Sequence, residues 1–209
     1  MVRKIFALSC LIMTMAGLAI NLYAYPHFGE LFSYFTLQSN VLCLLSFLLI
    51  VLAPDTRPEI ILRGCALTAI TLTFLVYHFL LRSPDMALSN LGNMKVLSDF
   101  FNHYLVPAAA ICNYFFLCPK GQFSRRHPLI WLLYPAMYII YVHIYSFCGG
   151  TFIVSGEIRP MPYFFLDAEQ VGSPAVALWI LIIAAAFFIL SCIYVAADRI
   201  LSGRRHALR

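Results

Sequence analysis

Long apolar stretches separated by short polar loops make up most of this chain. Six stretches have the length of about 20 residues that an α-helix needs to cross a bilayer. They cover residues 5–24, 31–53, 59–81, 97–118, 128–147 and 174–200. Proline and glycine, which favour turns, lie in the loops between them, as at Pro54, Pro84, Pro119 and Gly149. The pattern predicts an all-α polytopic membrane protein with six transmembrane helices, forming a single domain over residues 1–209.

Composition and charge support this fold class and orient the chain. Hydrophobic residues make up 62% of the sequence and charged residues 11%, a balance that a soluble domain could not bury. Of the 14 Lys and Arg residues, Arg82, Lys95 and Arg159 fall on one side of the predicted spans and the others on the opposite side. The positive-inside rule therefore predicts that both termini are cytoplasmic. Membrane orientation also explains the net charge of +5, and nothing in the charge pattern indicates nucleic-acid binding.

Two groups of polar residues interrupt the apolar pattern at one predicted depth. The first is the run YFTLQSN at residues 34–40, and the second is Asp99 with Asn102 and His103. Lipid offers such side chains no hydrogen-bond partners, so we expect them to face the protein interior or a wet cavity. At 1.5 Å per residue, Thr36 lies roughly 8 Å into its predicted helix, and His103 lies about as far into the fourth span. Both residues therefore fall in the outer half of the bilayer.

These residues offer the groups of an acyl-transfer site. The Thr36 hydroxyl becomes a nucleophile when a base takes its proton, and the imidazole of His103 is suited to do so near neutral pH. Asp99 precedes His103 by four residues and could orient its ring, with Asn102 as a further supporting residue. Asp167, in the last outer loop, is the alternative partner for His103.

The rest of the first polar run has candidate roles in the same site. Asn40, one helical turn after the threonine, is the candidate donor to a developing oxyanion. Tyr34, Gln38 and Ser39 are candidate contacts to the substrate. Structural interpretations of these residues stay open, because a membrane threonine often bonds its own helix and a Gln-Ser-Asn run can join helices. Asp99 could equally cap the start of its helix.

Other notable side chains have ordinary structural explanations. His78 and His143 lie near the outer ends of their spans, where they could form hydrogen bonds in the interface. Trp131 and Tyr163 suit the aromatic belts found at membrane surfaces. The structural explanation is the leading one for each of these four residues.

Four short motifs follow one another along the predicted spans. They are YFTLQSN at 34–40, NHYLVP at 102–107, YP at 134–135 and YFFLD at 163–167. In this order they resemble the bacterial branch of the androgen-induced-protein-like membrane family, which includes the androgen-dependent regulator of tissue factor pathway inhibitor. The resemblance covers nearly the whole chain and implies threonine hydrolases that cleave fatty acid esters of hydroxy fatty acids. The residues that match the family's Thr and His are Thr36 and His103.

The leading hypothesis is an intramembrane lipid ester hydrolase without a cofactor or a metal. A membrane lipid or fatty-acyl ester would enter it sideways from the outer leaflet, and the resemblance implies a bacterial inner membrane. One alternative is a protein in which His78, His103 and His143 hold zinc, as another kind of hydrolase, or haem. A second alternative is a small-molecule transporter, although the sequence shows neither repeat halves nor paired broken helices.

Overall fold

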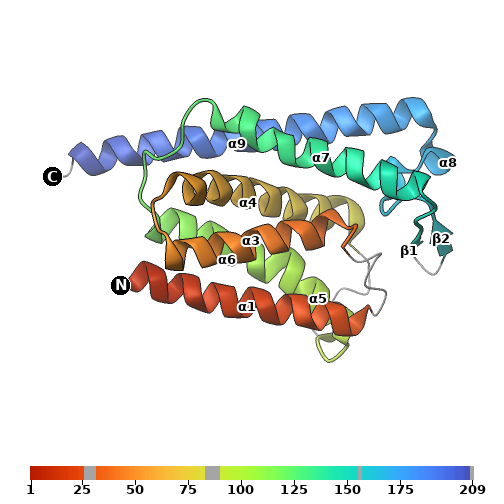
Figure 1. Cartoon of the computed structure of the whole chain (residues 1–209), viewed down its shortest axis with the longest axis horizontal. Coiled ribbons are helices and arrows are strands. Elements are labelled where there is room, and N and C mark those ends of the chain that lie inside the picture. The colour runs from red at the N-terminus through yellow and green to blue at the C-terminus, as the bar shows by residue number, and fades with distance from the viewer. Residues whose placement is uncertain (26–31, 83–89, 155–156, 208–209) are drawn as a thin grey trace.

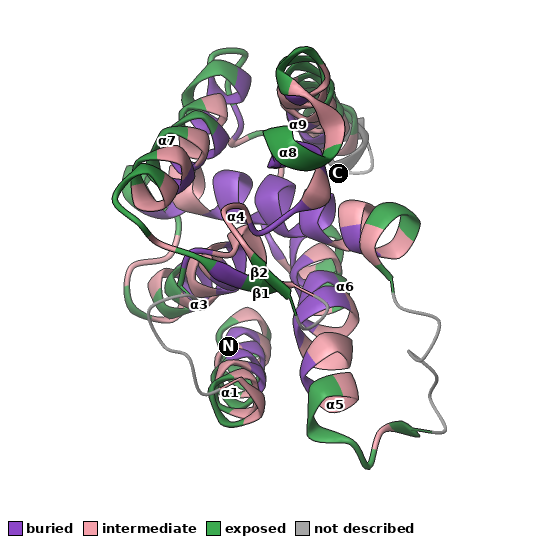
Figure 2. Ribbon diagram, turned by 90° about the vertical axis from the view of Figure 1, so that its right-hand side faces the viewer, coloured by how far each residue is buried: buried purple, intermediate pink, exposed green. Residues whose placement is uncertain are grey.

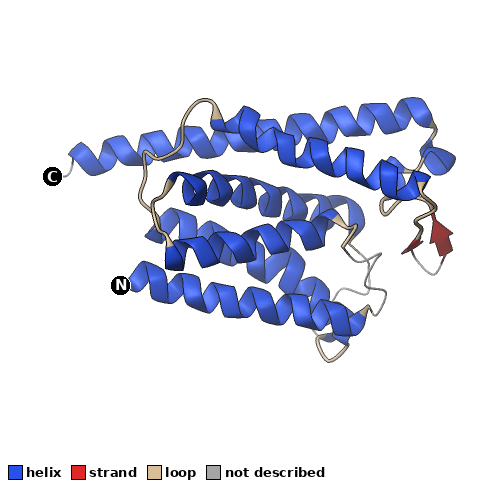
Figure 3. Ribbon diagram, in the orientation of Figure 1, coloured by secondary structure: helices blue, strands red, loops and turns tan. Residues whose placement is uncertain are grey.

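The computed structural model describes residues 1–25, 32–82, 90–154 and 157–207, and its regular structure is almost entirely helical (Figures 1 and 3). The long helices are α1 (Val2–Ala24), α3 (Phe35–Leu52), α4 (Arg57–Val76), α7 (His127–Phe147) and α9 (Ser173–Ala207). Among the described residues, 5 helices are long and apolar enough to cross a membrane, and they fall on these elements. The predicted helical fold class is therefore confirmed apart from one short β-hairpin, and the long apolar helices are those of an integral membrane protein. The predicted start of the second span at residue 31 lies outside the described residues, and α3 begins only at Phe35.

The fourth predicted span is helical but irregular. It consists of α5 (Met94–Phe100), the π turn η3 (Phe101–Leu105), α6 (Val106–Cys112) and a second π turn, η4 (Asn113–Leu117). Pro107 favours the first π turn because it has no N–H to offer to the carbonyl of His103, four residues earlier. The N–H of Val106 bonds instead to the carbonyl of Phe101, five residues earlier. Helix α4 also ends in a π turn, η1 (Tyr77–Leu81).

A compact cap follows α7 and covers the end of the bundle where α3 begins (Figure 1). It contains an antiparallel hairpin of β1 (Phe152–Val154) and β2 (Glu157–Arg159), the 3-10 turn η5 (Phe164–Leu166) and the short helix α8 (Ala168–Val171). Its buried side chains, Phe152, Tyr163, Phe165 and Leu166, form one cluster with Tyr138 of α7. This cluster brings a loop distant in sequence against the start of α3.

Helix α4 lies at the centre of the bundle and is the most extensively buried of the long helices (Figure 2). Gly64 lets α7 approach it closely, because a Cβ at this position would lie 1.9 Å from the Trp131 ring. The Trp131 side chain is only 1% exposed, so its expected place in an aromatic belt was wrong. On the outer faces of α7 and α9, large apolar side chains such as Leu133 and Leu181 are exposed, as lipid contact requires.

Ionic contacts tie together the end of the bundle that holds the N-terminus. Arg3 donates to both carboxylate oxygens of Asp55, at 2.9 and 3.0 Å, and also pairs with the buried Glu59. Glu59 pairs with Arg63 of the same helix at 3.2 Å, and Arg63 donates to Gln122 in the loop before α7. Burial alone would raise the pKa of Asp55, but hydrogen bonds from Gln122 and Arg3 outweigh it and hold the pKa below its usual range. Three of the segments rich in Lys and Arg therefore meet at one end, while the orientation in the membrane stays a prediction.

Candidate functional site

The structure brings Thr36 and His103 together, although 67 residues separate them in the chain. Thr36 lies in the first turn of α3, and His103 lies in the π turn η3. The distance from Thr36 Oγ1 to His103 Nε2 is 3.2 Å, within hydrogen-bond reach. The imidazole is buried, with 9% of the residue exposed. A hydroxyl and a ring nitrogen thus meet inside the apolar bundle, as the two polar motifs predicted.

The surroundings of His103 determine which of its nitrogens carries the proton. Its Nδ1 lies 3.1 Å from the backbone carbonyl oxygen of Asp99 and 3.7 Å from Oδ1 of the same residue. A carbonyl oxygen can only accept a hydrogen bond, so Nδ1 must be the donor. Nε2 then keeps its lone pair, which faces the Thr36 hydroxyl. This is the tautomer that a base acting on Thr36 needs.

Tyr77 holds both His103 and Asp99. Its ring stacks on the imidazole with the centroids 3.7 Å apart and an angle of 10° between the planes. Its hydroxyl donates to Oδ2 of Asp99 at 3.2 Å. Tyr77 and His103 lie in the π turns η1 and η3, and π turns of this kind are frequent at functional sites. Nothing in the sequence marks Tyr77, because only a helical register that the hydropathy pattern does not encode turns it toward the imidazole.

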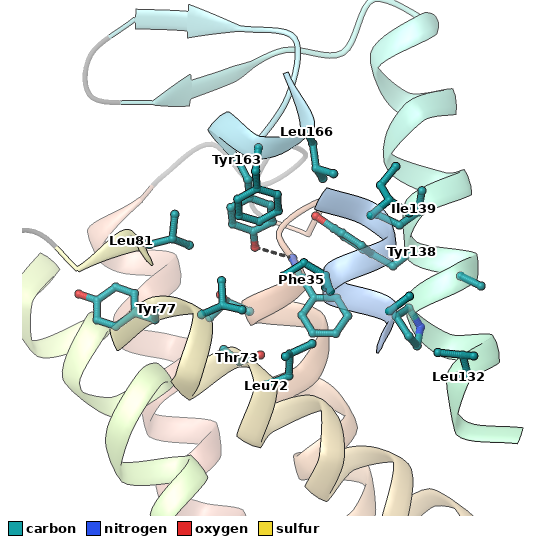
Figure 4. A pocket seen from close by; sticks show the side chains of 18 of the residues that line it. Phe35, Leu72, Thr73, Tyr77, Leu81, Leu132, Tyr138, Ile139, Tyr163 and Leu166 are labelled. Atoms are coloured by element: carbon teal, nitrogen blue, oxygen red, sulfur yellow. Dashed lines mark hydrogen bonds between the residues drawn. The ribbon is translucent and has the colours of Figure 1, made fainter. Parts of the chain in front are cut away.

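Tyr163 completes the site from the cap. Its hydroxyl accepts a hydrogen bond from the N–H of Phe35 at 3.1 Å (Figure 4) and is also hydrogen-bonded to Thr36. Burial raises the pKa of the Tyr163 phenol, so this group stays neutral and can donate a proton in a hydrogen bond. The residue is 9% exposed and its expected place in an aromatic belt was wrong. The YFFLD motif had marked this loop without showing which residue meets Thr36.

Two of the predicted supporting residues, Asn40 and Asn102, have structural roles here. Both N–H groups of the Asn40 amide are engaged, with the carbonyl of Thr36 at 2.8 Å and that of Asn102 at 3.1 Å. Asn40 therefore has no N–H left for an oxyanion, which contradicts its predicted role. The amide of Asn102 donates to the carbonyls of Gly17 in α1 and Ser98 in α5 rather than to the Thr36 hydroxyl. Asn102 therefore joins its own span to α1.

The two candidate partners of His103 are now distinguished. The carboxylate of Asp167 accepts from the N–H of Glu169 and the side chain of Gln170, and it caps α8. Asp99, in contrast, touches the imidazole through its carbonyl. The structure therefore favours Asp99 as the residue that orients His103.

The predicted substrate contacts do not line the cavity described below. Gln38 donates to the carbonyl of Phe32. Ser39 bonds to Thr73 at 2.8 Å and to the carbonyl of Thr36 at 3.0 Å, which joins α3 to α4. Tyr34 packs its ring edge to face against Phe152 and Tyr163. All three act within the protein rather than at a ligand surface.

An apolar cavity of about 380 Å³ lies beside Thr36 (Figure 4). It is bounded by α3, α4 with its π turn, α7, the cap and α9. None of the described residues that line it is charged, and its polar side chains are Thr36, Thr73, Tyr77, Tyr138 and Tyr163. Ala136 and Ile140 of α7 belong to the lining and are also exposed on the outer surface of the bundle. The nucleophile candidate therefore faces a space suited to a hydrocarbon chain.

The other two histidines of the metal hypothesis have separate partners. His78 Nδ1 lies 3.2 Å from the hydroxyl of Tyr104, and His143 Nδ1 lies 2.8 Å from the carbonyl of Ile139 in its own helix. Within the described ranges, no three His, Cys, Asp or Glu side chains are grouped closely enough to hold a metal ion. A scan of protein-family models and searches of curated proteins and of solved structures found no match to this chain. The geometry of the site is therefore the basis for its interpretation.

Proposed function

We propose that the protein is an intramembrane hydrolase of fatty-acyl esters in which Thr36 is the nucleophile and His103 the base. The observation that carries this proposal is the Thr36 hydroxyl, which lines an apolar cavity and lies 3.2 Å from the lone-pair nitrogen of a buried imidazole. An unassisted threonine hydroxyl is a weak nucleophile, and an adjacent oriented base is the usual way to activate it. The resemblance implies the same residue pair and fatty acid esters of hydroxy fatty acids as substrates.

The proposed reaction has two halves. Thr36 Oγ1 attacks the acyl carbonyl carbon while His103 Nε2 takes the hydroxyl proton, and the carbonyl oxygen becomes an oxyanion. The neutral Tyr163 hydroxyl is the donor that stabilises this oxyanion, in the role first predicted for Asn40. The bond to the alcohol oxygen then breaks, and the protonated imidazole gives its proton to the departing alkoxide. Thr36 is left as an acyl ester. A water molecule that His103 deprotonates cleaves this ester, releases the fatty acid and restores the hydroxyl.

The membrane arrangement that we propose has six spans with both termini in the cytoplasm. The helical stretch 94–117 would be the remaining span, since its residues would extend about 35 Å at 1.5 Å per residue. The site would then lie in the outer half of a bacterial inner membrane. Substrate would enter sideways from the outer leaflet, past the exposed lining residues Ala136 and Ile140.

Hydrolysis of a medium-chain acyl ester by the purified protein in detergent tests the proposal. We expect Thr36→Ala and His103→Ala each to lower kcat by about 10²–10⁴-fold, and the double variant to lose little more, because the two groups act as a unit. Thr36→Ser, which keeps the hydroxyl, should retain measurable activity. Thr68→Ala is the matched control, because the hydroxyl of this buried threonine bonds, among the described residues, to the carbonyl of Gly64 in its own helix.

Two results would contradict the mechanism. One is full turnover by His103→Ala, which would remove the base from the reaction. The other is activity that a chelator abolishes and zinc restores, which would favour a metal-dependent hydrolase instead. Size-exclusion profiles and helical circular dichroism like those of the parent would show that each variant is folded.

A further inference from the structure

We propose that the cavity beside Thr36 is the binding site for the acyl chain of the ester, and that its closed end limits the chain to roughly fifteen carbons. This inference rests on the proposed function and names the part of the substrate that the cavity holds. It commits to the acyl side of the ester rather than the alcohol side.

The position of His103 decides between the two sides. The imidazole must reach the leaving oxygen to protonate it, so the alcohol has to lie on the side of Thr36 where Nε2 is found. His103 does not belong to the cavity lining, whereas Thr36 does. The acyl chain, on the other side of the reacting carbon, is therefore directed into the cavity. The uncharged lining suits a hydrocarbon chain and would leave a carboxylate without a partner.

The size of the cavity limits the chain. A cavity of roughly 150 Å³ holds one benzene molecule, or about 25 Å³ per carbon. By the same measure, the cavity of about 380 Å³ accommodates roughly fifteen carbons. Its lining on α7 extends from Leu132 to Ile140, about 12 Å along the helix axis at 1.5 Å per residue.

The deep end of the cavity is formed by Leu72, Leu132 and Ala184. Helices α4 and α7 run toward the cap, so their lowest-numbered lining residues, Leu72 and Leu132, lie farthest from it, as Figure 4 shows. Helix α9 runs the opposite way, and Ala184 is its last lining residue. Next to Leu132, the Trp131 ring packs against Gly64 and closes the space between α7 and α4. A chain that extends from Thr36 ends at this wall.

Discrimination between chains at this wall is steric. A chain that moves from lipid into the cavity stays in apolar surroundings, so extra methylenes add little transfer energy. Carbons beyond the available volume must crowd the wall, and overpacking of a closed apolar site is unfavourable. The limit should therefore appear as a decline in rate above a threshold length.

Rates for 4-methylumbelliferyl esters test this inference, because the alcohol stays constant while the acyl chain varies from about 4 to about 20 carbons. We expect kcat/KM to fall at least about tenfold between about 14 and about 20 carbons. Ala184→Phe adds a phenyl ring, which fills the volume of about six carbons, so the threshold should drop by about that number. Ala185→Phe is the matched control, since the neighbouring Ala185 is exposed and does not line the cavity. Its profile should equal that of the parent.

A second variant keeps the test decisive if Ala184→Phe does not fold. Leu132→Ala removes three carbons from the wall and should raise the threshold by about three carbons. A parent profile that stays level to the longest chain, or identical profiles for Ala184→Phe and Ala185→Phe, would overturn the acyl-chain site while leaving the hydrolase intact. No turnover of any chain length by the parent would instead refute the proposed function, and this inference with it.

Discussion

In a Tyr77→Phe variant, loss of one phenol oxygen should slow catalysis while leaving substrate binding nearly unchanged. The hydroxyl of Tyr77 donates to the carboxylate Oδ2 of Asp99 at 3.2 Å, and the same residue accepts from Nδ1 of His103 through its backbone carbonyl at 3.1 Å. Phenylalanine keeps the ring that stacks on the imidazole and lines the cavity. The variant therefore removes the support of Asp99 and preserves the packing around the site. Tyr77 is a positioning residue, because it acts on the reaction through its two neighbours.

The structure sets the size of this effect. A hydrogen bond between two protein groups contributes about 1 kcal/mol net, and somewhat more when one partner is charged. The Asp99 side chain is 28% exposed and the bond is longer than ideal, so we take the range from about 1 to about 1.4 kcal/mol. If this energy orients the imidazole in the transition state, kcat should fall by about five- to tenfold. KM should change by less than about twofold, because the ring at the cavity wall is retained.

Steady-state hydrolysis of a single acyl ester by parent and variant in the same detergent measures both constants. Tyr104→Phe is the matched control, since the hydroxyl that it removes bonds to His78 rather than to Asp99. Its kcat should match that of the parent. An unchanged kcat in Tyr77→Phe, or an equal loss in Tyr104→Phe, would refute the assignment of Tyr77 as a positioning residue. A rise in KM with constant kcat would assign the hydroxyl to substrate binding instead.

Two further predictions concern the membrane orientation and the packing of the core. If both termini are in the cytoplasm, the exposed native Cys148 should react with an impermeant maleimide on intact cells. A cysteine introduced by Arg125→Cys in a Cys148→Ser background should stay unlabelled. The reverse labelling would show that the chain has the opposite orientation. Gly64→Ala should lower the free energy of unfolding by about 1–3 kcal/mol, because the new methyl group would overlap the Trp131 ring. Gly92→Ala, which meets no atom within 4 Å, should leave the melting temperature in detergent unchanged, and equal melting of both variants would contradict the packing argument.

The sequence by itself indicated the helical membrane fold and the residues around which the site is built. Lipid leaves backbone groups without partners, so a long apolar stretch has to become a helix whatever surrounds it. The same argument marks Thr36 and His103, because polar side chains within such a stretch need protein or water partners. Their common depth followed from the rise per residue and the order of the spans, which are local properties of the chain.

Only the tertiary structure decided which side chains complete the site. Hydropathy does not encode how far each helix is rotated about its axis, and the shift from α to π geometry near Pro107 changes that rotation further. For this reason Asn40 faces backbone carbonyls, while Tyr77 faces the imidazole. Tyr163 reaches Thr36 from a loop more than 100 residues away in the chain. The hydrogen bond from Phe35 to the Tyr163 hydroxyl likewise joins residues that are 128 positions apart. Such a contact depends on how the cap folds over the bundle, which is a property of the packed molecule and not of any one segment.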